Sequence, residues 1–155
     1  MRPKSRHNQY ALVSLGNLHW KIAVSSPGGK SRDDNFKRAA ELFTKALDLK
    51  PSNVYAANGL GIVCALRRNW KDARDIFLST KQECNIIDVW GNLGIAYFEL
   101  GQYASALNCI ELCLPKSESN FDLLLLKAKC FFCQGKFERN DETVRKAIKE
   151  MEKVD

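Results

Sequence analysis

The stretch from residue 88 to residue 114 constrains the fold of this chain more than any other. Tyr97 follows Leu93 by four residues, so the two side chains share one face of a helix. Gly101 stands where that helix is expected to end, because glycine adopts the left-handed backbone of a helix C-terminus at little cost. A second helix is expected to begin at Tyr103. The stretch therefore predicts two antiparallel helices joined by a tight turn.

The same pattern recurs upstream at a fixed spacing. The step along the chain from Gly61 to Gly94 equals the step from Ala73 to Ala106. We interpret these four residues as small because the two helices of a pair cross closely at them. The repetition predicts a second helix pair of the same design.

Two further copies complete the chain. Gly135 and Phe137 follow Gly101 and Tyr103 by nearly the same step, and Arg68 replaces the turn glycine in the second copy. The chain is therefore expected to consist of four helix pairs. A fold repeated in this way is all-α and elongates by stacking one pair on the next.

The first copy contains an insertion. The separation between Gly16 and Ala39 is almost twice that between Gly61 and Ala73, the matching residues of the next copy. About 11 extra residues, rich in Ser, Pro, Gly and charge, are expected to form a loop near residues 25–33. Asp33 or Asp34 would then cap the following helix.

These spacings resemble the tetratricopeptide repeat (TPR), a pair of antiparallel helices of roughly 34 residues. The resemblance implies an all-α TPR solenoid of about four helix pairs, forming a right-handed superhelix with a concave groove. Residues 1–9 are expected to form a flexible basic leader before a TPR domain over residues 10–155. The expected repeats are 10–53, with the insertion, 54–86, 87–120 and 121–153.

The composition is typical of a soluble globular protein. The net charge of +6 comes from lysines and arginines scattered among acidic residues, without aromatic side chains interleaved in a basic stripe. Direct nucleic-acid binding is therefore not expected. No apolar run approaches the roughly 18 residues of a membrane helix, and the basic N-terminus lacks the apolar stretch of a secretory signal.

The six cysteines leave an alternative open. Cys130 and Cys133 form a C-x-x-C pair, and Cys109 precedes Cys113 by four residues. A thiol redox or metal protein is one interpretation, but both pairs fall inside predicted helices, where free cysteine packs as a small apolar residue. His19 is likewise interpreted as a ring packed between two helices. No metal site, cofactor or catalytic constellation is expected, so the chain is not predicted to be an enzyme.

Binding is the activity that the predicted architecture favours, because the first helices of successive repeats line the concave face. The register assigns that face a mixture of apolar anchors and amides able to bond a peptide backbone. The predicted groove residues are Tyr55, Asn58, Ile62, Leu66, Asp88, Asn92, Ile95, Phe98, Glu99, Leu125, Lys129 and Phe132.

A known TPR function can be tested on the same register. Chaperone-binding TPR domains hold a C-terminal carboxylate with lysine, arginine and asparagine at set groove positions. Asn17 matches the asparagine, but Val13 stands where the first lysine belongs, and Asp88 and Asn92 replace the later basic residues. Binding of chaperone tails is therefore not expected.

Several segments carry a narrower resemblance. Residues 53–63 read NVYAANGLGIV, residues 73–77 read ARDIF, residues 88–93 read DVWGNL and residues 102–106 read QYASA. They resemble the TPR scaffold subunits of the RNA polymerase II-associated factor (PAF) complex over roughly residues 10–114. The resemblance implies a nuclear, non-catalytic scaffold that binds other PAF complex subunits and the polymerase machinery, and is tied to transcription elongation and histone modification.

Two alternatives remain at this point. The chain is either part of such a transcription scaffold or a generic TPR adaptor or co-chaperone-like binding module unrelated to transcription. Self-association through an open end of the solenoid is also possible for a finite stack of repeats.

Overall fold

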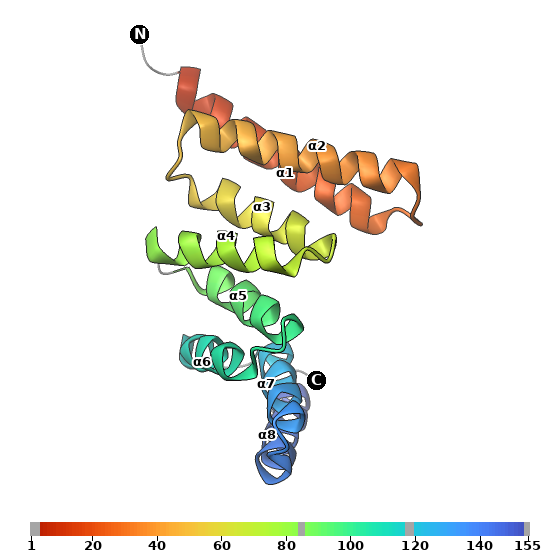
Figure 1. Cartoon of the computed structure of the whole chain (residues 1–155), viewed down its shortest axis with the longest axis vertical. Helices are drawn as coiled ribbons and strands as arrows, with labels where there is room; N and C mark the ends of the chain where they lie inside the picture. Colours follow the sequence, from red (N-terminus) through yellow and green to blue (C-terminus); the bar gives the residue numbers. More distant parts are fainter. Residues whose placement is uncertain (1–3, 84–85, 117–119, 154–155) are drawn as a thin grey trace. The chain divides into compact units, whose positions relative to one another are not determined.

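A computed structural model describes residues 4–83, 86–116 and 120–153, and these residues form eight α-helices and one 3-10 turn, without a strand (Figure 1). The predicted all-α class is confirmed. The elements are α1 (Lys4–Ser25), α2 (Lys30–Leu49), α3 (Val54–Leu66), α4 (Trp70–Glu83), α5 (Ile87–Glu99), α6 (Tyr103–Cys113), η1 (Leu114–Lys116), α7 (Phe121–Cys133) and α8 (Phe137–Met151).

The chain divides into two compact units, Met1–Cys84 and Asn85–Asp155. In the first unit, α1 pairs with α2, α3 pairs with α4, and α2 also packs on α3. In the second unit, α5 pairs with α6, α7 pairs with α8, and α6 packs on α7. Each unit thus contains two helix pairs, and the second helix of one pair packs on the first helix of the next.

The first helix pair differs from the prediction at both of its ends. α1 begins at Lys4, inside the stretch predicted to be a flexible leader over residues 1–9. The predicted loop near residues 25–33 shrinks to a short turn, because Gly28 and Gly29 adopt φ values of 111° and 80° and reverse the chain at once. The inserted residues lengthen the helices instead, so α1 has 22 residues and α2 has 20.

The predicted cap of α2 is also wrong. Gly29 occupies the N-cap position without a side-chain hydrogen bond, and Asp33 lies in the first turn of the helix. An acidic side chain there still stabilises the helix, because it faces the positive end of the helix dipole. Asn53 shows the other arrangement: its side chain accepts a hydrogen bond from the backbone N–H of Ala56 at 3.1 Å and caps α3.

Phe43 of α2 holds the first three helices together. Its ring is fully buried and fills the space left by two glycines, Gly16 of α1 and Gly59 of α3. A Cβ atom added at Gly16 would lie 2.7 Å from the ring, and one added at Gly59 would lie closer still. Both helices therefore approach α2 through the edge of one aromatic ring.

The role predicted for the small residues is correct at some positions only. Phe77 of α4 fills the space beside Gly61, as Phe43 does beside Gly59. A Cβ atom at Gly94 would instead lie 3.5 Å from side-chain atoms of Cys109 and Ile110, which is ordinary van der Waals contact. The close approach at Gly61 is thus ring against backbone, whereas the space beside Gly94 would accept a methyl group.

The turns inside the helix pairs use a left-handed residue. Gly101 has a φ of 74° and ends the turn after α5. Arg68, in the matching position after α3, has a φ of 60°, although an arginine adopts this backbone less readily than glycine does. The turn after α3 therefore has the same left-handed backbone as the turn after α5, although arginine stands there in place of glycine.

In the second unit, two kinds of buried contact join α6, α7 and α8. Ile110 and Cys113 of α6 pack with Leu123 and Cys130 of α7 in one apolar cluster. Asn140 of α8 donates a side-chain hydrogen bond to the Ala128 carbonyl of α7 at 2.8 Å. This bond satisfies an asparagine at the repeat position that Ala106 takes in the preceding pair.

The difference between Gly59 and Gly94 gives a matched test of the ring contact. Alanine in a helix interior is favoured over glycine by about 1 kcal/mol, so Gly94→Ala should raise the free energy of unfolding by up to that amount. Gly59→Ala should lower it by about 1–3 kcal/mol, because the added methyl group displaces the Phe43 ring. Urea unfolding of both variants measures the difference. A Gly59→Ala protein as stable as Gly94→Ala would contradict the tight packing of the Phe43 ring against Gly59.

Candidate protein-binding surfaces

The predicted groove residues of the first unit lie together on α3. Tyr55 is 67% exposed, and the side chains of Asn58 and Ile62 are partly buried. Leu66 is also partly buried, because it packs against the apolar cluster around Phe43. Tyr55 is thus the largest anchor that α3 offers to a partner.

Tyr10 of α1 is a second exposed tyrosine, outside the predicted set. It stands to Tyr55 in the repeat register as Gly16 stands to Gly61, and it is 70% exposed. α1 and α3 contact each other within the unit. The repeat register already pairs Tyr10 with Tyr55, and the structure adds that the Tyr10 side chain is exposed.

The five predicted residues of α5 divide by burial. The charged residues Asp88 and Glu99 are exposed, Ile95 is 41% exposed, and Asn92 is partly buried. Phe98 is partly buried as well, since its ring packs at 5.5 Å from the ring of Tyr103 at the start of α6. Ile95 is therefore the exposed apolar side chain of this set.

The predicted residues of α7 include an exposed aromatic. Phe132 is 60% exposed and packs edge to face on Phe137 of α8, which is 59% exposed, with ring centroids 5.6 Å apart. Lys129 is exposed and Leu125 is partly buried. α5 and α7 contact each other, so the second unit presents both sets from neighbouring helices.

The predicted residues therefore gather on two surfaces, one on α3 and one on α5 and α7. A hollow of about 530 Å³ is lined by Gly135, Lys136, Phe137, Glu138 and Arg139. A smaller one of about 240 Å³ is lined by Ile87, Trp90, Leu112, Cys113 and Lys116. The predicted groove residues line neither hollow, so a continuous concave groove stays a prediction.

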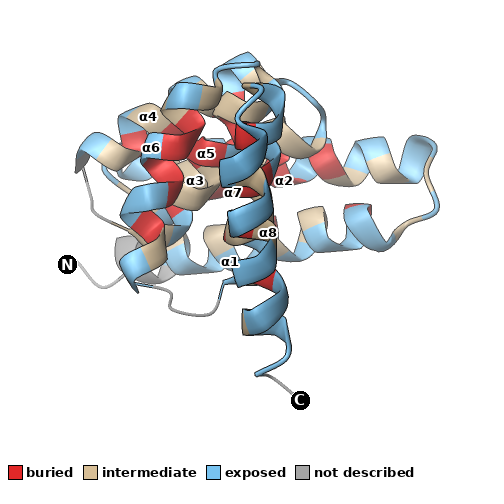
Figure 2. Cartoon of the chain, turned by 90° about the horizontal axis from the view of Figure 1, so that it is seen from below, coloured by how far each residue is buried: buried red, intermediate tan, exposed pale blue. Residues whose placement is uncertain are grey.

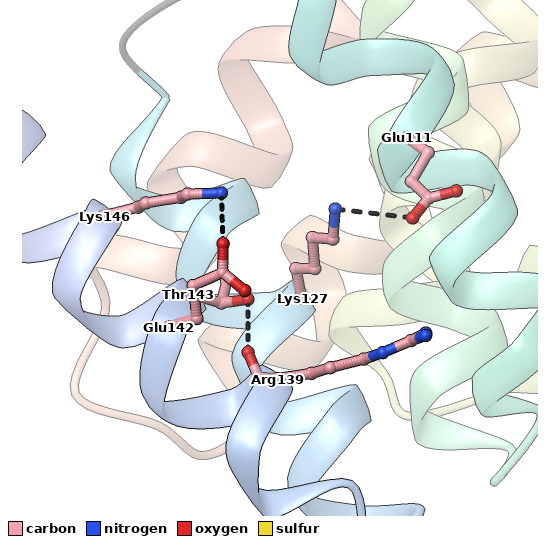
Figure 3. A network of polar contacts seen from close by, with 6 residues as sticks. All are labelled: Glu111, Lys127, Arg139, Glu142, Thr143 and Lys146. Atoms are coloured by element: carbon pink, nitrogen blue, oxygen red, sulfur yellow. Dashed lines mark hydrogen bonds and ion pairs between the residues drawn. The ribbon is translucent and has the colours of Figure 1, made fainter.

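Charged side chains cover part of the second unit. Lys127 of α7 reaches Glu111 of α6 at 3.3 Å, and Lys146 pairs with Glu142 at 2.8 Å along α8 (Figure 3). The hydrogen bond from Lys146 lowers the pKa of the exposed Glu142 carboxyl. Exposed pairs of this kind contribute little to stability, so this is a solvated surface.

Most of the cysteines in the part of the chain that the structure describes are packing residues, whereas Cys133 is exposed. Cys109, Cys113 and Cys130 are buried, and none of the described cysteines forms a disulfide. Burial raises the pKa of the Cys64 and Cys113 thiols, and raises that of Cys130 to about 11. A raised pKa disfavours the thiolate that redox chemistry requires. Cys84 lies outside the described residues.

The remaining chemical candidates have structural partners. His19 lies between α1 and α2, where its Nδ1 atom and the Asn35 side-chain oxygen are hydrogen bonded at 2.8 Å. The described residues hold no group of three His, Cys, Asp or Glu side chains placed to bind a metal ion. Within the same ranges, every helix is too short or too polar to cross a membrane.

What the two surfaces offer chemically is non-covalent contact. Exposed tyrosine, isoleucine and phenylalanine side chains supply apolar anchors, and Asn58 and Asn92 carry amides that both donate and accept hydrogen bonds. Aromatic anchors of this kind dominate the energetics of protein interfaces. The arrangement suits recognition of a polypeptide segment.

Comparison with protein families identifies the repeat. Residues 31–84 and residues 87–114 each match the family described as Tetratricopeptide repeat. Together these two ranges include more than half of the chain. The TPR assignment made from the glycine and alanine spacing is confirmed.

Curated relatives extend the similarity beyond the repeat itself. The chain is 37% identical over 119 residues to RNA polymerase-associated protein CTR9 of Caenorhabditis elegans, covering 75% of this chain and 10% of that protein. It is 32% identical to Protein CTR9 homolog of Arabidopsis thaliana and 29% identical to RNA polymerase-associated protein CTR9 of Saccharomyces cerevisiae, covering 91% and 92% of this chain. It spans only 14% of each of these two proteins. The resemblance carried by residues 53–63 and the other quoted segments is confirmed.

Solved structures show the same fold at lower identity. The chain superposes on a structure of MamA with a TM-score of 0.81 and 18% identity, covering 95% of this chain and 80% of that one. It superposes on YrrB, described as a TPR protein with an unusual peptide-binding site, with a TM-score of 0.75 and 19% identity, covering 90% and 66%. At these identities the likeness concerns the fold alone.

The burial of Cys130 gives a prediction about thiol reactivity. With a pKa of about 11, about 0.1% of this thiol is ionised at pH 8, against about a quarter for a free cysteine of pKa 8.5. Native iodoacetamide labelling should therefore modify the exposed Cys133 well before Cys130, and the Cys130 rate should rise with pH towards 11. Peptide mass spectrometry measures both sites.

Unfolding in urea supplies the control for this experiment. It should remove the difference between the two cysteines, because both then have the pKa and accessibility of a free thiol. Fast native labelling of Cys130 at pH 8 would contradict the packing role and support the thiol alternative.

Proposed function

This chain belongs to the tetratricopeptide repeat family, and on that premise we propose that it is a protein-interaction scaffold whose first helices bind a segment of another protein. The observation that carries the proposal is the exposure of apolar side chains on those helices. Tyr55 of α3, Ile95 of α5 and Phe132 of α7 are 67%, 41% and 60% exposed. Packing within the chain leaves them available.

The setting that we propose is transcription. The chain would be a nuclear segment of the PAF complex scaffold subunit, and its partners would be other subunits of that complex. Two observations support this: the similarity to RNA polymerase-associated proteins over most of this chain, and the sequence segments that resemble those subunits. In this role the chain positions other proteins and catalyses no reaction.

We assign the binding surfaces to the residues predicted from the register, with Tyr10 added. The partner segment would place apolar side chains against Tyr55 and Tyr10 in one unit and against Ile95 and Phe132 in the other. The amides of Asn58 and Asn92 stand beside these anchors on α3 and α5. A segment with alternating apolar and polar residues, extended or helical, fits this pattern.

The test uses a pair of variants in the second unit. Ile95→Glu places a charge on the proposed surface, and Leu112→Glu places one on α6, where Leu112 is 54% exposed. The tagged chain would be incubated in nuclear extract, and the captured proteins would be identified by mass spectrometry. Wild type and Leu112→Glu should recover polymerase-associated factors, and Ile95→Glu should lose them by about tenfold or more, since a buried unpaired charge is costly.

Circular dichroism establishes that both variants fold as the wild type does. Equal capture by both variants would retain the transcription role and reject the surface on α5 and α7. Capture of unrelated proteins by all three chains would reject the transcription role and leave a TPR adaptor of another process.

A further inference from the structure

The turn between α3 and α4 carries three exposed basic side chains, Arg67, Arg68 and Lys71, which we call the basic turn. In the repeat register, the residues at the same positions are Leu100, Gly101 and Ala104 after α5, and Gln134, Gly135 and Glu138 after α7. The second unit therefore forms this turn twice without a basic side chain at these positions. The geometry of the turn does not require the three positive charges.

Two of the three side chains stand where they disfavour the fold. Arg68 has a φ of 60°, in the left-handed region that Gly101 and Gly135 occupy at 74° and 72°. This backbone brings the Cβ atom of an L-residue too close to the following carbonyl oxygen. Lys71 lies in the first turn of α4, where the helix dipole disfavours a positive charge. Residues that break such local rules without a gain in packing are typical of functional sites.

No carboxylate in the described part of the chain forms an ion pair with the basic turn. The two acidic side chains that follow it in the sequence have other partners. Asp72 accepts a hydrogen bond from the side-chain amide of Asn69, and Asp75 pairs with Arg74 at 2.8 Å. The donors of the basic turn are therefore left to water or to a ligand.

The turn between α1 and α2 lies at the same edge of the first unit. α1 and α3 contact each other and run in the same direction, so the turns that follow them share that edge (Figure 1). The turn after α1 is exposed over most of its length, and Lys30, which follows it, is also exposed (Figure 2). Helix pairs stack through the faces of their helices, so further pairs would leave this edge open.

The positive charge of the chain is concentrated in the same unit. Residues 1–84 carry 15 basic and 7 acidic side chains, whereas residues 85–155 carry 9 and 11. A charge distribution of this kind attracts an acidic partner to the first unit before any contact forms. The basic turn then offers exposed donors that such a partner can reach.

We propose that the basic turn binds an acidic segment of a partner protein, in which closely spaced aspartate or glutamate side chains pair with Arg67, Arg68 and Lys71. An arginine guanidinium binds a carboxylate through two parallel hydrogen bonds, so two adjacent arginines select two carboxylates close together in sequence. This contact is separate from the proposed apolar surfaces. Tyr55 stands at the start of α3, and the basic turn follows its end.

A peptide fits this edge better than a nucleic acid does. Asp72 lies beside the basic turn, and Asp33 and Asp34 follow Lys30, so a continuous run of phosphates along the edge would meet these carboxylates. Single strands are bound by a basic groove with aromatic side chains on which the bases stack. Trp70, the aromatic residue within the basic turn, is partly buried. A short segment with a few carboxylates needs neither a long track nor a stacking surface.

The experiment is an NMR titration of the full chain, labelled with 15N, with a hexaglutamate peptide at physiological salt. The amide signals of residues 67–72 should shift. Arg67→Gln/Arg68→Gln should bind the peptide about three- to tenfold more weakly than wild type, because each exposed ion pair contributes modestly. Lys45→Gln/Lys50→Gln is the matched control, since it removes the same charge from exposed positions towards the other end of α2. This control should bind within about twofold of wild type.

Arg68→Gly separates binding from folding. Glycine adopts the left-handed backbone at little cost, so this variant should unfold at a higher urea concentration than wild type. It should nevertheless bind hexaglutamate more weakly, because one guanidinium is lost. A variant that is more stable but binds less well shows that the arginine serves a ligand and not the turn.

Three results would overturn the proposal. The first is a wild type whose residues 67–72 do not respond to hexaglutamate. The second is a control variant that loses as much affinity as Arg67→Gln/Arg68→Gln, which would assign the binding to net charge alone. The third is an oligothymidylate strand of equal charge that shifts residues 67–72 at lower concentration than hexaglutamate, which would make the ligand a nucleic acid. None of these results bears on the capture of partners through Ile95.

Discussion

The ring of Phe43 between the backbones of Gly16 and Gly59 sets the spacing of the first three helices. An aromatic ring of this size fits there because both glycines lack a Cβ atom, so one side chain of α2 packs on two first helices at once. The apolar cluster around it then includes residues of α1, α2 and α3. Because protein interiors are close-packed, this contact also determines which side chains of the three helices face away from the cluster.

A first helix in this fold has three faces with separate roles. One face packs on the second helix of its own pair, and a second face packs on the second helix of the preceding pair. α3 shows both, since Gly61 lies against Phe77 of α4 and Val63 lies in the cluster of α2. The third face keeps Tyr55 in water. Binding to a partner and packing between helix pairs therefore use different faces of equivalent helices.

The sequence predicted the features that depend on short-range spacing. Glycine and alanine recur at one repeat length, and this periodicity located the helix pairs. The sequence prediction of the insertion as a loop was wrong, because Lys30 and Ser31 can belong to a helix or to a loop. The backbone of Gly28 and Gly29 makes the turn, and α2 begins directly after it. The sequence also did not show which glycines lie against an aromatic ring and which would accept a methyl group, because the ring beside a glycine comes from another helix. The division into units at residues 84 and 85 and the exposure of Tyr10 follow from long-range packing, which periodicity does not contain.

The proposed binding surface stays open when a first helix packs on two second helices, as α3 packs on α2 and α4. Tyr55 remains 67% exposed although Leu60 and Val63, on the neighbouring face, are packed against α2. Tyr10 stands to Leu15 and Leu18 as Tyr55 stands to Leu60 and Val63, because the same register joins the two helices. A helix packed on Leu15 and Leu18 would therefore leave Tyr10 exposed. The stacking of helix pairs and the binding of a partner therefore use different side chains, so each added helix pair extends the binding surface of a scaffold.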